Sequence, residues 1–284
     1  MPPRPTIAEK RRRYRELHQA GCFVLPNPWD VGTARYLQHL GFEALATTSS
    51  GLAFGLGLPD ADWAVPVDVV LAHIRGLVEA TDLPVNADFE SGYAHEPEGV
   101  AGNVRRCVET GVAGLSIEDA TGDRAAPLYD FALAVERIRA SRDAIDRAGG
   151  EVVLTARCES FLVGRPDLDE VVRRLAAYAE AGADCLYAPG LRTRAEIAAV
   201  VDAVAPKPVN ILMSGPLGLT VADLAALGAR RISLGSALAR AAWGGFIRAA
   251  RELAEEGRFE ALADAAPFAE LNTFFRNDVQ RRAP

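Results

Sequence analysis

The stretch Pro84-Val85-Asn86-Ala87-Asp88-Phe89-Glu90-Ser91-Gly92-Tyr93 is a short apolar strand that runs directly into two carboxylates and a glycine turn. Side chains two residues apart point to one side of an extended backbone, so we expect Asp88 and Glu90 to share a side. Two anions held this close repel each other unless a cation or a shared proton lies between them. Mg²⁺ held by oxygen ligands is the simplest resolution; two independent acids in a solvated loop are the alternative.

The same pattern of a short apolar run followed by a helix-like segment recurs along most of the chain. The expected strands are 22–25, 44–47, 84–88, 114–118, 152–157, 185–188, 208–212 and 231–234. Apolar residues at helical spacing fill the segments between them, such as 99–110, 130–148, 168–181 and 193–204. Glycine stands at the expected helix C-termini before several strands, namely Gly41, Gly111, Gly182 and Gly228. Without a Rossmann-type glycine motif, this alternation predicts a closed (β/α)₈ barrel of the TIM type, with a doubly wound open sheet as the competitor.

The two ends of the chain lie outside the alternating pattern. Residues 7–20 form an expected basic, amphipathic leading helix, whose charge we interpret as a solvated face. Residues 236–284 are helical in character, with one long helix over 239–256 and a short helix that begins at 267. No linker or low-complexity segment separates these parts, so residues 1–284 are predicted to be a single domain.

Composition narrows the class of protein. The net charge of −7 and the pI of about 5.3 argue against a nucleic-acid groove, although a metal or a local arginine can still attract an anionic substrate. No apolar run is long enough to span a bilayer, and the first residues lack the apolar core of a signal peptide. The four cysteines are scattered and form no C-x-x-C pair. We therefore expect a reduced cytoplasmic protein that binds neither nucleic acid nor membrane.

In a barrel of this type the active site lies at the carboxyl ends of the strands. Acids cluster there on neighbouring strands, and an arginine follows on the next strand. The residues at the expected ends include Ser50, Gly51, Asp88, Glu90, Glu118, Asp119, Arg157, Glu159 and Asn210. This concentration predicts a site for a small carboxylate substrate.

A chemical role can be assigned to most of these residues. Asp88, Glu90 and Glu118, directly or through water, would hold Mg²⁺, and the ion would stabilise an enolate that forms when a bond beside a carbonyl breaks. Arg157 suits a bidentate grip on a substrate carboxylate; the alternative is a structural ion pair with Glu159.

Other residues carry weaker assignments. The backbone N–H groups of Ser50 and Gly51 suit a second substrate carboxylate. Asn210 is a further candidate for contact with the substrate; the alternative is that its side chain does not face the pocket. We interpret His95 as an exposed loop residue and Asp30 as a helix N-cap.

These motifs together resemble those of the isocitrate lyase/phosphoenolpyruvate mutase superfamily over roughly residues 15–250. The segments that carry the resemblance are Pro26-Asn27-Pro28-Trp29-Asp30, Thr48-Ser49-Ser50-Gly51-Leu52, Leu58-Pro59-Asp60, Asn86–Tyr93, Ile117-Glu118-Asp119 and Thr155-Ala156-Arg157-Cys158-Glu159. The resemblance implies a (β/α)₈ barrel, Mg²⁺ with Mn²⁺ as the alternative, and 2-oxo acid or dicarboxylate chemistry. It also implies a homo-oligomer, a dimer or tetramer, that exchanges C-terminal helices between subunits.

By position, the resemblance assigns Asp60, Asp88, Glu90 and Glu118 to the metal shell. It assigns Ser50 and Gly51 to one substrate carboxylate and Arg157 to the other. Asp60, Glu118 and Arg157 become the expected catalytic residues, and Asp60 is identified by the resemblance alone.

One segment departs from the family pattern. Lyases of the family carry a K-[KR]-C-G-H loop after the Glu-Asp pair, with Cys as the acid/base, and mutases carry Lys and Asn there. Here the segment Ala120-Thr121-Gly122-Asp123-Arg124-Ala125-Ala126-Pro127 has no Cys, Lys or His. The best match is therefore a Mg²⁺-dependent carbon–carbon lyase or decarboxylase acting on an oxaloacetate-like or substituted-malate-like acid through a metal-bound enolate, with water or Arg124 as the final proton source. The alternatives are a hydrolase of an acyl- or phosphono-pyruvate and a barrel that binds a 2-oxo acid without turnover.

Overall fold

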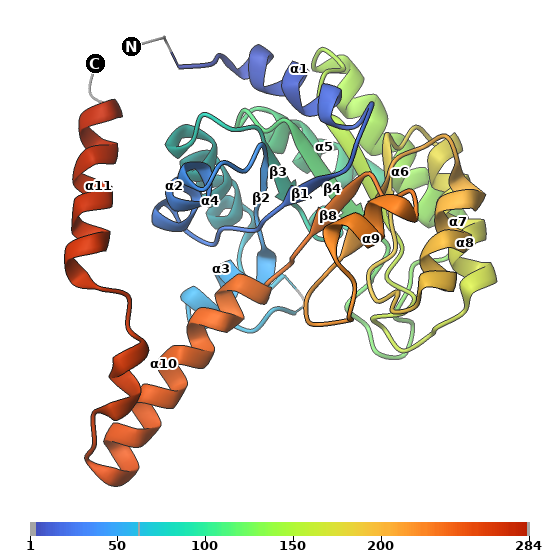
Figure 1. Cartoon of the computed structure of the whole chain (residues 1–284). Coiled ribbons are helices and arrows are strands. Elements are labelled where there is room, and N and C mark those ends of the chain that lie inside the picture. The colour runs from blue at the N-terminus through green and yellow to red at the C-terminus, as the bar shows by residue number, and fades with distance from the viewer. Residues whose placement is uncertain (1–3, 62, 283–284) are drawn as a thin grey trace. The chain divides into compact units, whose positions relative to one another are not determined.

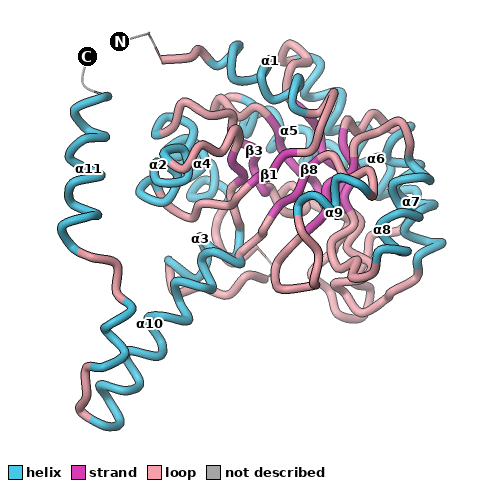
Figure 2. Tube along the Cα trace, viewed as in Figure 1, coloured by secondary structure: helices cyan, strands magenta, loops and turns pink. Residues whose placement is uncertain are grey.

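The computed structural model describes residues 4–61 and 63–282 of the chain. These divide into two compact units, one that ends at Ser236 and one that begins at Ala237. In the first unit, eight parallel strands form a nearly closed barrel with helices packed around it, as Figures 1 and 2 show. The (β/α)₈ barrel predicted from the strand–helix alternation is therefore confirmed.

The strands lie within one or two residues of their predicted positions. They are β1 (Phe23–Leu25), β2 (Leu45–Ala46), β3 (Val85–Asp88), β4 (Gly114–Glu118), β5 (Val153–Arg157), β6 (Cys185–Tyr187), β7 (Val209–Leu212) and β8 (Arg231–Ser233). Their order in the sheet is β1-β8-β7-β6-β5-β4-β3-β2. Between the two outermost strands, the Ala46 N–H donates to the Pro26 carbonyl oxygen at 3.0 Å, which links the strand ends across the closure.

The helices of the first unit follow the expected spacing. They are α1 (Ile7–Leu17), α2 (Val31–His39), α3 (Ser49–Gly55), α4 (Val67–Ala80), α5 (Pro97–Val108), α6 (Phe131–Arg147), α7 (Leu168–Glu180), α8 (Arg194–Val204) and α9 (Val221–Ala226). Asp30 is the N-cap of α2, as predicted, and accepts from the Thr33 N–H at 2.7 Å. The four glycines expected at helix C-termini all have positive φ, from +86° to +105°, a region that residues with a Cβ rarely adopt.

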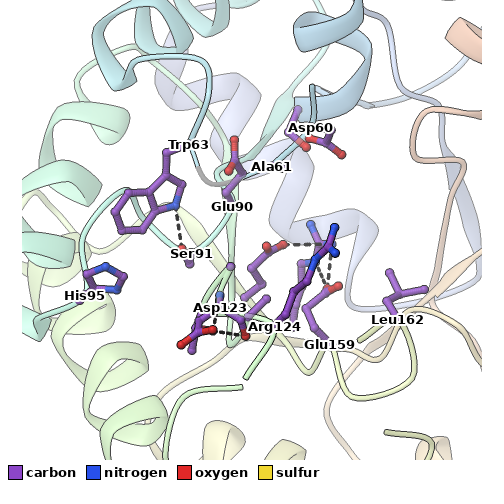
Figure 3. A pocket seen from close by; sticks show the side chains of 16 residues that line it. Asp60, Ala61, Trp63, Glu90, Ser91, His95, Asp123, Arg124, Glu159 and Leu162 are labelled. Atoms are coloured by element: carbon purple, nitrogen blue, oxygen red, sulfur yellow. Dashed lines mark hydrogen bonds and ion pairs between the residues drawn. The ribbon is translucent and has the colours of Figure 1, made fainter. Parts of the chain in front are cut away.

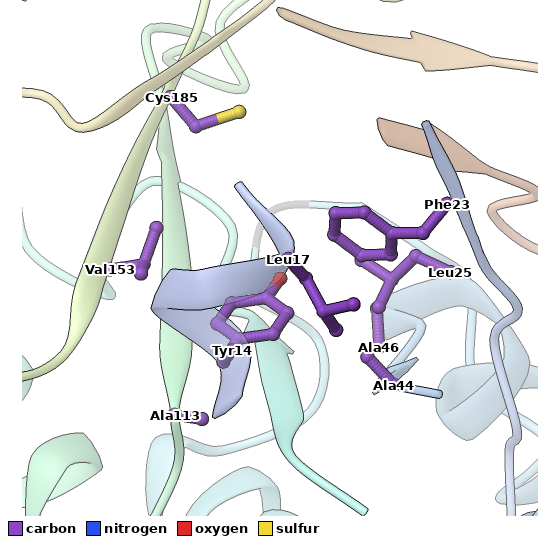
Figure 4. Packing of buried hydrophobic residues seen from close by; sticks show 9 residues of the cluster. All are labelled: Tyr14, Leu17, Phe23, Leu25, Ala44, Ala46, Ala113, Val153 and Cys185. Carbon is purple, nitrogen blue, oxygen red and sulfur yellow. The ribbon is translucent and has the colours of Figure 1, made fainter. Parts of the chain in front are cut away.

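Helix α1 covers the amino ends of the strands. Thr6 and Glu9 form a capping box at its start, which stabilises the helix where its backbone N–H groups lack partners. Tyr14 and Leu17 are buried in one cluster with residues that lie in the strands or directly before them: Phe23, Leu25, Ala44, Ala46, Ala113, Val153 and Cys185 (Figure 4). The amino end of the barrel is thus closed by apolar packing.

A buried arginine lies beside this apolar cluster. Arg231, only 2% exposed, donates from Nε to Asn210 Oδ1 at 2.8 Å and from Nη2 to Thr155 Oγ1 at 3.1 Å. Its Nη1 donates to Tyr14 Oη at 3.0 Å and to His18 Nε2 at 3.3 Å. Of the acids that the structure describes, none forms an ion pair with Arg231, so neutral groups alone solvate this charge.

His18 is held in its neutral form by the same network. Its Nδ1–H donates to the Tyr14 carbonyl oxygen at 2.7 Å, which leaves Nε2 as the acceptor that faces Arg231. Burial, followed by the charge of Arg231, lowers the pKa of His18 from 6.5 to about 3.

We expect His18 to make the protein acid-sensitive. Because the pKa is lower in the folded state, the unfolded chain takes up the proton first, and stability falls as the pH drops below 6.5. The loss between pH 7.5 and pH 5 approaches about 2 kcal/mol for this one group. Urea unfolding across this range should show a shallower pH dependence in His18→Gln than in the wild type. The same substitution at the exposed His39 is the control, and equal slopes in all three proteins would contradict the assignment.

The second unit consists of α10 (Ala237–Glu256), a 3₁₀ turn η1 (Glu260–Asp264) and α11 (Phe268–Arg282). The long helix was predicted closely, whereas α11, at 15 residues, is longer than the short helix expected from residue 267. Large apolar side chains on this unit are exposed, including Trp243, Phe246 and Phe268. Exchange of these helices between subunits stays a prediction. Within the described ranges, no helix combines the length and the apolar character needed to cross a membrane.

Candidate active site

A pocket of about 730 Å³ opens at the carboxyl ends of the strands. It lies where the predicted polar residues follow β3, β4 and β5, and it is closed on one side by the segment after β4. Figure 3 shows Asp60, Ala61 and Glu90 along one side and Asp123, Arg124 and Glu159 along the other. The lining residues are Ser49, Asp60, Ala61, Trp63, Glu90, Ser91, His95, Glu118, Ala120, Thr121, Gly122, Asp123, Arg124, Arg157, Glu159 and Leu162.

Arg157 is the centre of the charged network in this pocket. Its Nη1 lies 2.6 Å from Asp88 Oδ1, and its Nη2 lies 3.1 Å from Glu118 Oε2 and 2.8 Å from Glu159 Oε1. Glu118 and Arg157 are direct neighbours in the β4–β5 register, which brings the two side chains together. The carboxylates outweigh burial and raise the pKa of Arg157 well above its usual value. The ion pair with Glu159, which the sequence offered as an alternative role for Arg157, is present.

The two carboxylates of the opening motif do not share a strand. β3 ends at Asp88, and Glu90 has φ +44°, a left-handed conformation that turns the chain out of the strand. The expected same-side placement through strand pleating is therefore wrong. The two groups are nevertheless close enough to interact, because the charge of Asp88 contributes to the raised pKa of Glu90.

Burial is the main cause of the pKa shifts of the carboxyl groups in the pocket. Burial raises the pKa of Glu90 to about 7. The hydrogen bond that the Tyr93 hydroxyl donates to Glu90 Oε1 at 2.5 Å opposes this rise. Burial and then the charge of Asp88 raise the pKa of Asp60. Burial also raises the pKa of Glu118 well above its usual value, although Arg157 opposes the shift. These carboxyl groups carry an electrostatic penalty that a cation would relieve.

A buried arginine holds the turn that follows Glu90. Arg137 on α6 donates to the carbonyl oxygens of Ser91, Ala94 and His95, and its guanidinium stacks over the Tyr129 ring at 3.9 Å. The Tyr129 hydroxyl is 2.8 Å from His95 Nδ1. His95 is exposed, as expected, but the structure also places it on the pocket wall with Trp63, a residue that no motif in the sequence marks.

Of the residues predicted to bind substrate, Arg157 lines the pocket, whereas Ser50 and Gly51 are not among the residues that line it. Ser49 lines the pocket and its backbone N–H donates to Asp88 Oδ2 at 3.0 Å, whereas the Gly51 N–H donates to Thr48 Oγ1 at 3.2 Å. The Ser50 hydroxyl is hydrogen-bonded to Asp60, which partly opposes the burial that raises the pKa of that carboxyl.

Asn210 is not among the residues that line the pocket. Its side chain is buried between Ser233 and Arg231, where it donates to Ser233 Oγ at 2.9 Å. A direct substrate contact by Asn210 stays a prediction.

The carboxylates of the pocket suit a Mg²⁺ ion that is bound in part through water. In the part of the chain that the structure describes, no three His, Cys, Asp or Glu side chains converge as a cage that could hold a metal ion. Mg²⁺ does not require a cage, since it usually keeps several waters and binds through one or two carboxylates plus substrate oxygens. The pocket acids Asp60, Glu90 and Glu118, whose pKa values are all raised, fit this water-mediated mode.

Comparison with known proteins finds relatives that span most of the chain. The phosphoenolpyruvate phosphomutase family matches residues 14–254. An oxaloacetate decarboxylase from Rhodopseudomonas palustris is 31% identical over 75% of this chain and 72% of its own. A solved protein from Burkholderia cenocepacia, provisionally named a lyase/mutase, is 49% identical with a TM-score of 0.91 over 95% of this chain and 97% of its own. A phosphonopyruvate hydrolase solved with oxalate and Mg²⁺ is 25% identical with a TM-score of 0.83 over 96% of each chain.

Proposed function

The chain belongs to the isocitrate lyase/phosphoenolpyruvate mutase superfamily, and from this premise we propose that it is a Mg²⁺-dependent lyase or decarboxylase of a small 2-oxo or hydroxy dicarboxylic acid. The observation that carries the proposal is the convergence of Glu90, Glu118 and Arg157 from three neighbouring strand ends on one pocket. An oxaloacetate-like acid is the preferred substrate class, because its carbon–carbon cleavage demands least of the loop that lacks Cys, Lys and His.

Each residue has a defined part in this proposal. Asp60, Asp88, Glu90 and Glu118 would hold the ion, in part through water. A bound Mg²⁺ supplies Lewis-acid stabilisation of the negative charge that develops on the substrate carbonyl oxygen. Arg157 positions Asp88, Glu118 and Glu159 through its three ion pairs and keeps a positive charge at the floor of the pocket.

Hydrolysis is the second candidate, and the match to the phosphonopyruvate hydrolase favours it. The two reactions separate by product. Decarboxylation of oxaloacetate releases pyruvate and CO₂, whereas hydrolysis consumes water and releases oxalate and acetate.

We expect the purified protein to be stabilised by oxaloacetate or a related 2-oxo acid only when Mg²⁺ is present. A ligand at 100 times its Kd adds about 2.7 kcal/mol of stability, which a thermal-shift measurement detects. The acids that stabilise the protein are then assayed for turnover with Mg²⁺, with Mn²⁺ and with EDTA, and the products are identified by NMR. Stabilisation without turnover would identify a non-catalytic barrel. If neither oxaloacetate nor any related 2-oxo acid stabilises the protein in the presence of Mg²⁺, the proposal is contradicted.

A further inference from the structure

Among the described residues that line the pocket, Arg124 is the one arginine that forms no ion pair with an acid. The pocket lining includes five acids and two arginines, Arg124 and Arg157. Arg157 directs its guanidinium to three carboxylates, so it acts as an organiser of the acid side. Arg124 is exposed on the segment after β4 and forms no ion pair with any acid in the ranges that the structure describes.

The segment that carries Arg124 is held in place by its own hydrogen bonds. Thr121 Oγ1 accepts from the Asp123 N–H at 3.0 Å and donates to the Ala126 carbonyl oxygen at 2.6 Å. Asp123 Oδ1 accepts from the Ala125 N–H at 2.8 Å. Arg124 lies between Asp123 and Ala125. Hydrogen bonds within the segment therefore hold the backbone of Arg124 in place before any ligand binds.

The base of the segment is anchored in the barrel wall. Asp119, 3% exposed, accepts from the Tyr178 hydroxyl at 2.6 Å, from Arg174 Nη1 at 3.2 Å and from the Glu159 N–H at 2.8 Å. At the other end, the Tyr129 N–H donates to the Asp119 carbonyl oxygen at 2.9 Å. Both ends of the loop are therefore fixed to the same buried residue.

This loop places a guanidinium opposite the acids that would hold the ion. Figure 3 shows Arg124 on the side of the pocket that faces Glu90 and Asp60. An acid chelated on the Glu90 side would extend its far end towards Arg124. A guanidinium remains charged at any relevant pH and binds a carboxylate through two parallel hydrogen bonds, which suits it to binding an anion and not to donating a proton.

We propose that Arg124 is the specificity-determining residue that binds the substrate carboxylate farthest from the reacting carbonyl. The inference rests on the proposed function and deepens it: Arg124 is the residue that distinguishes a dicarboxylic acid from acids that lack the second carboxylate, which bind weakly. Arg157 then organises the acids, and Arg124 selects the substrate.

The test compares two ligands in the presence of Mg²⁺ by calorimetry. Difluorooxaloacetate carries the distal carboxylate, and oxalate reproduces only the 2-oxo acid end. In Arg124→Met we expect binding of difluorooxaloacetate to weaken about 10- to 100-fold, since a charge-assisted pair is lost, while oxalate binding changes less than about 2-fold. Arg124→Lys should recover part of the loss. Arg192→Met, an exposed arginine outside the pocket lining, is the matched control and should bind both ligands as the wild type does.

The outcomes distinguish a failure of the role assigned to Arg124 from a failure of the proposed function. Wild-type affinity of Arg124→Met for difluorooxaloacetate, with oxalate still bound, overturns the role of Arg124 and leaves the proposed function in place. Equal weakening of both ligands also overturns it, because Arg124 would then act on the whole site. Failure of the wild type to bind either ligand overturns the proposed function and this inference with it.

Discussion

Asp88→Asn is expected to lower the Mg²⁺-dependent turnover of the best 2-oxo acid by at least about 100-fold, the cost of losing one well-placed electrostatic group. Asp88 accepts from the Ser49 N–H at Oδ2 and from Arg157 Nη1 at Oδ1, so both of its oxygens face donors. An asparagine presents its NH₂ group to one of these donors and breaks that contact. It also removes a charge from the expected metal shell. Initial rates at saturating Mg²⁺ measure the effect.

A control is needed because Asp88 also supports the fold. Asp169→Asn changes an exposed acid in the first turn of α7 and should retain full activity. The melting temperature of Asp88→Asn shows whether the variant folds. A folded variant with wild-type turnover would contradict the metal-site assignment.

Arg231→Met is expected to destabilise the barrel by about 3 kcal/mol, because the hydrogen bonds of a buried charged group are worth more than those of neutral groups. The substitution leaves Asn210 Oδ1, Thr155 Oγ1 and His18 Nε2 without their present donor. Removal of a buried charge offsets part of this cost, and so we expect a moderate loss instead of unfolding. The melting temperature should fall by about 6–12 °C.

The matched variant is Arg139→Met on the exposed face of α6, which should stay within about 0.5 kcal/mol of the wild type. Guanidinium unfolding at pH 7.5 measures both variants. A loss below about 1 kcal/mol in Arg231→Met would show that the network contributes little, contrary to this assignment. Arg231→Met should also flatten the acid sensitivity of His18, since the charge that helps to keep His18 neutral is gone.

Local sequence pattern was sufficient for the barrel. Apolar runs of four to six residues, helical spacing between them and a glycine at the helix ends are properties of neighbouring residues, so they can be read without knowing the rest of the fold. The carboxyl-end rule then assigned Glu90, Glu118 and Arg157 to one site, because parallel strands bring their ends to the same face. All three residues line the pocket, and their role in one catalytic site stays a prediction.

The sequence was a weaker guide to conformation and contacts inside the site. Glu90 leaves the strand, and the turn that follows it is held by Arg137, a residue more than forty positions away in the chain. The burial of Asn210 depends on Arg231, which belongs to a different strand. Neither partner leaves a local signal.

The chain by itself therefore determined the architecture, the family and the side of the barrel where acids gather, since these follow from periodicity, spacing and residue type. The tertiary structure decided which charge meets which: Arg157 is surrounded by three carboxylates, whereas Arg124 reaches the same pocket without an acidic partner in the described residues. The physical reason is that charge pairing depends on distances of a few ångströms between side chains from separate strands and loops, and only packing of the whole barrel sets those distances.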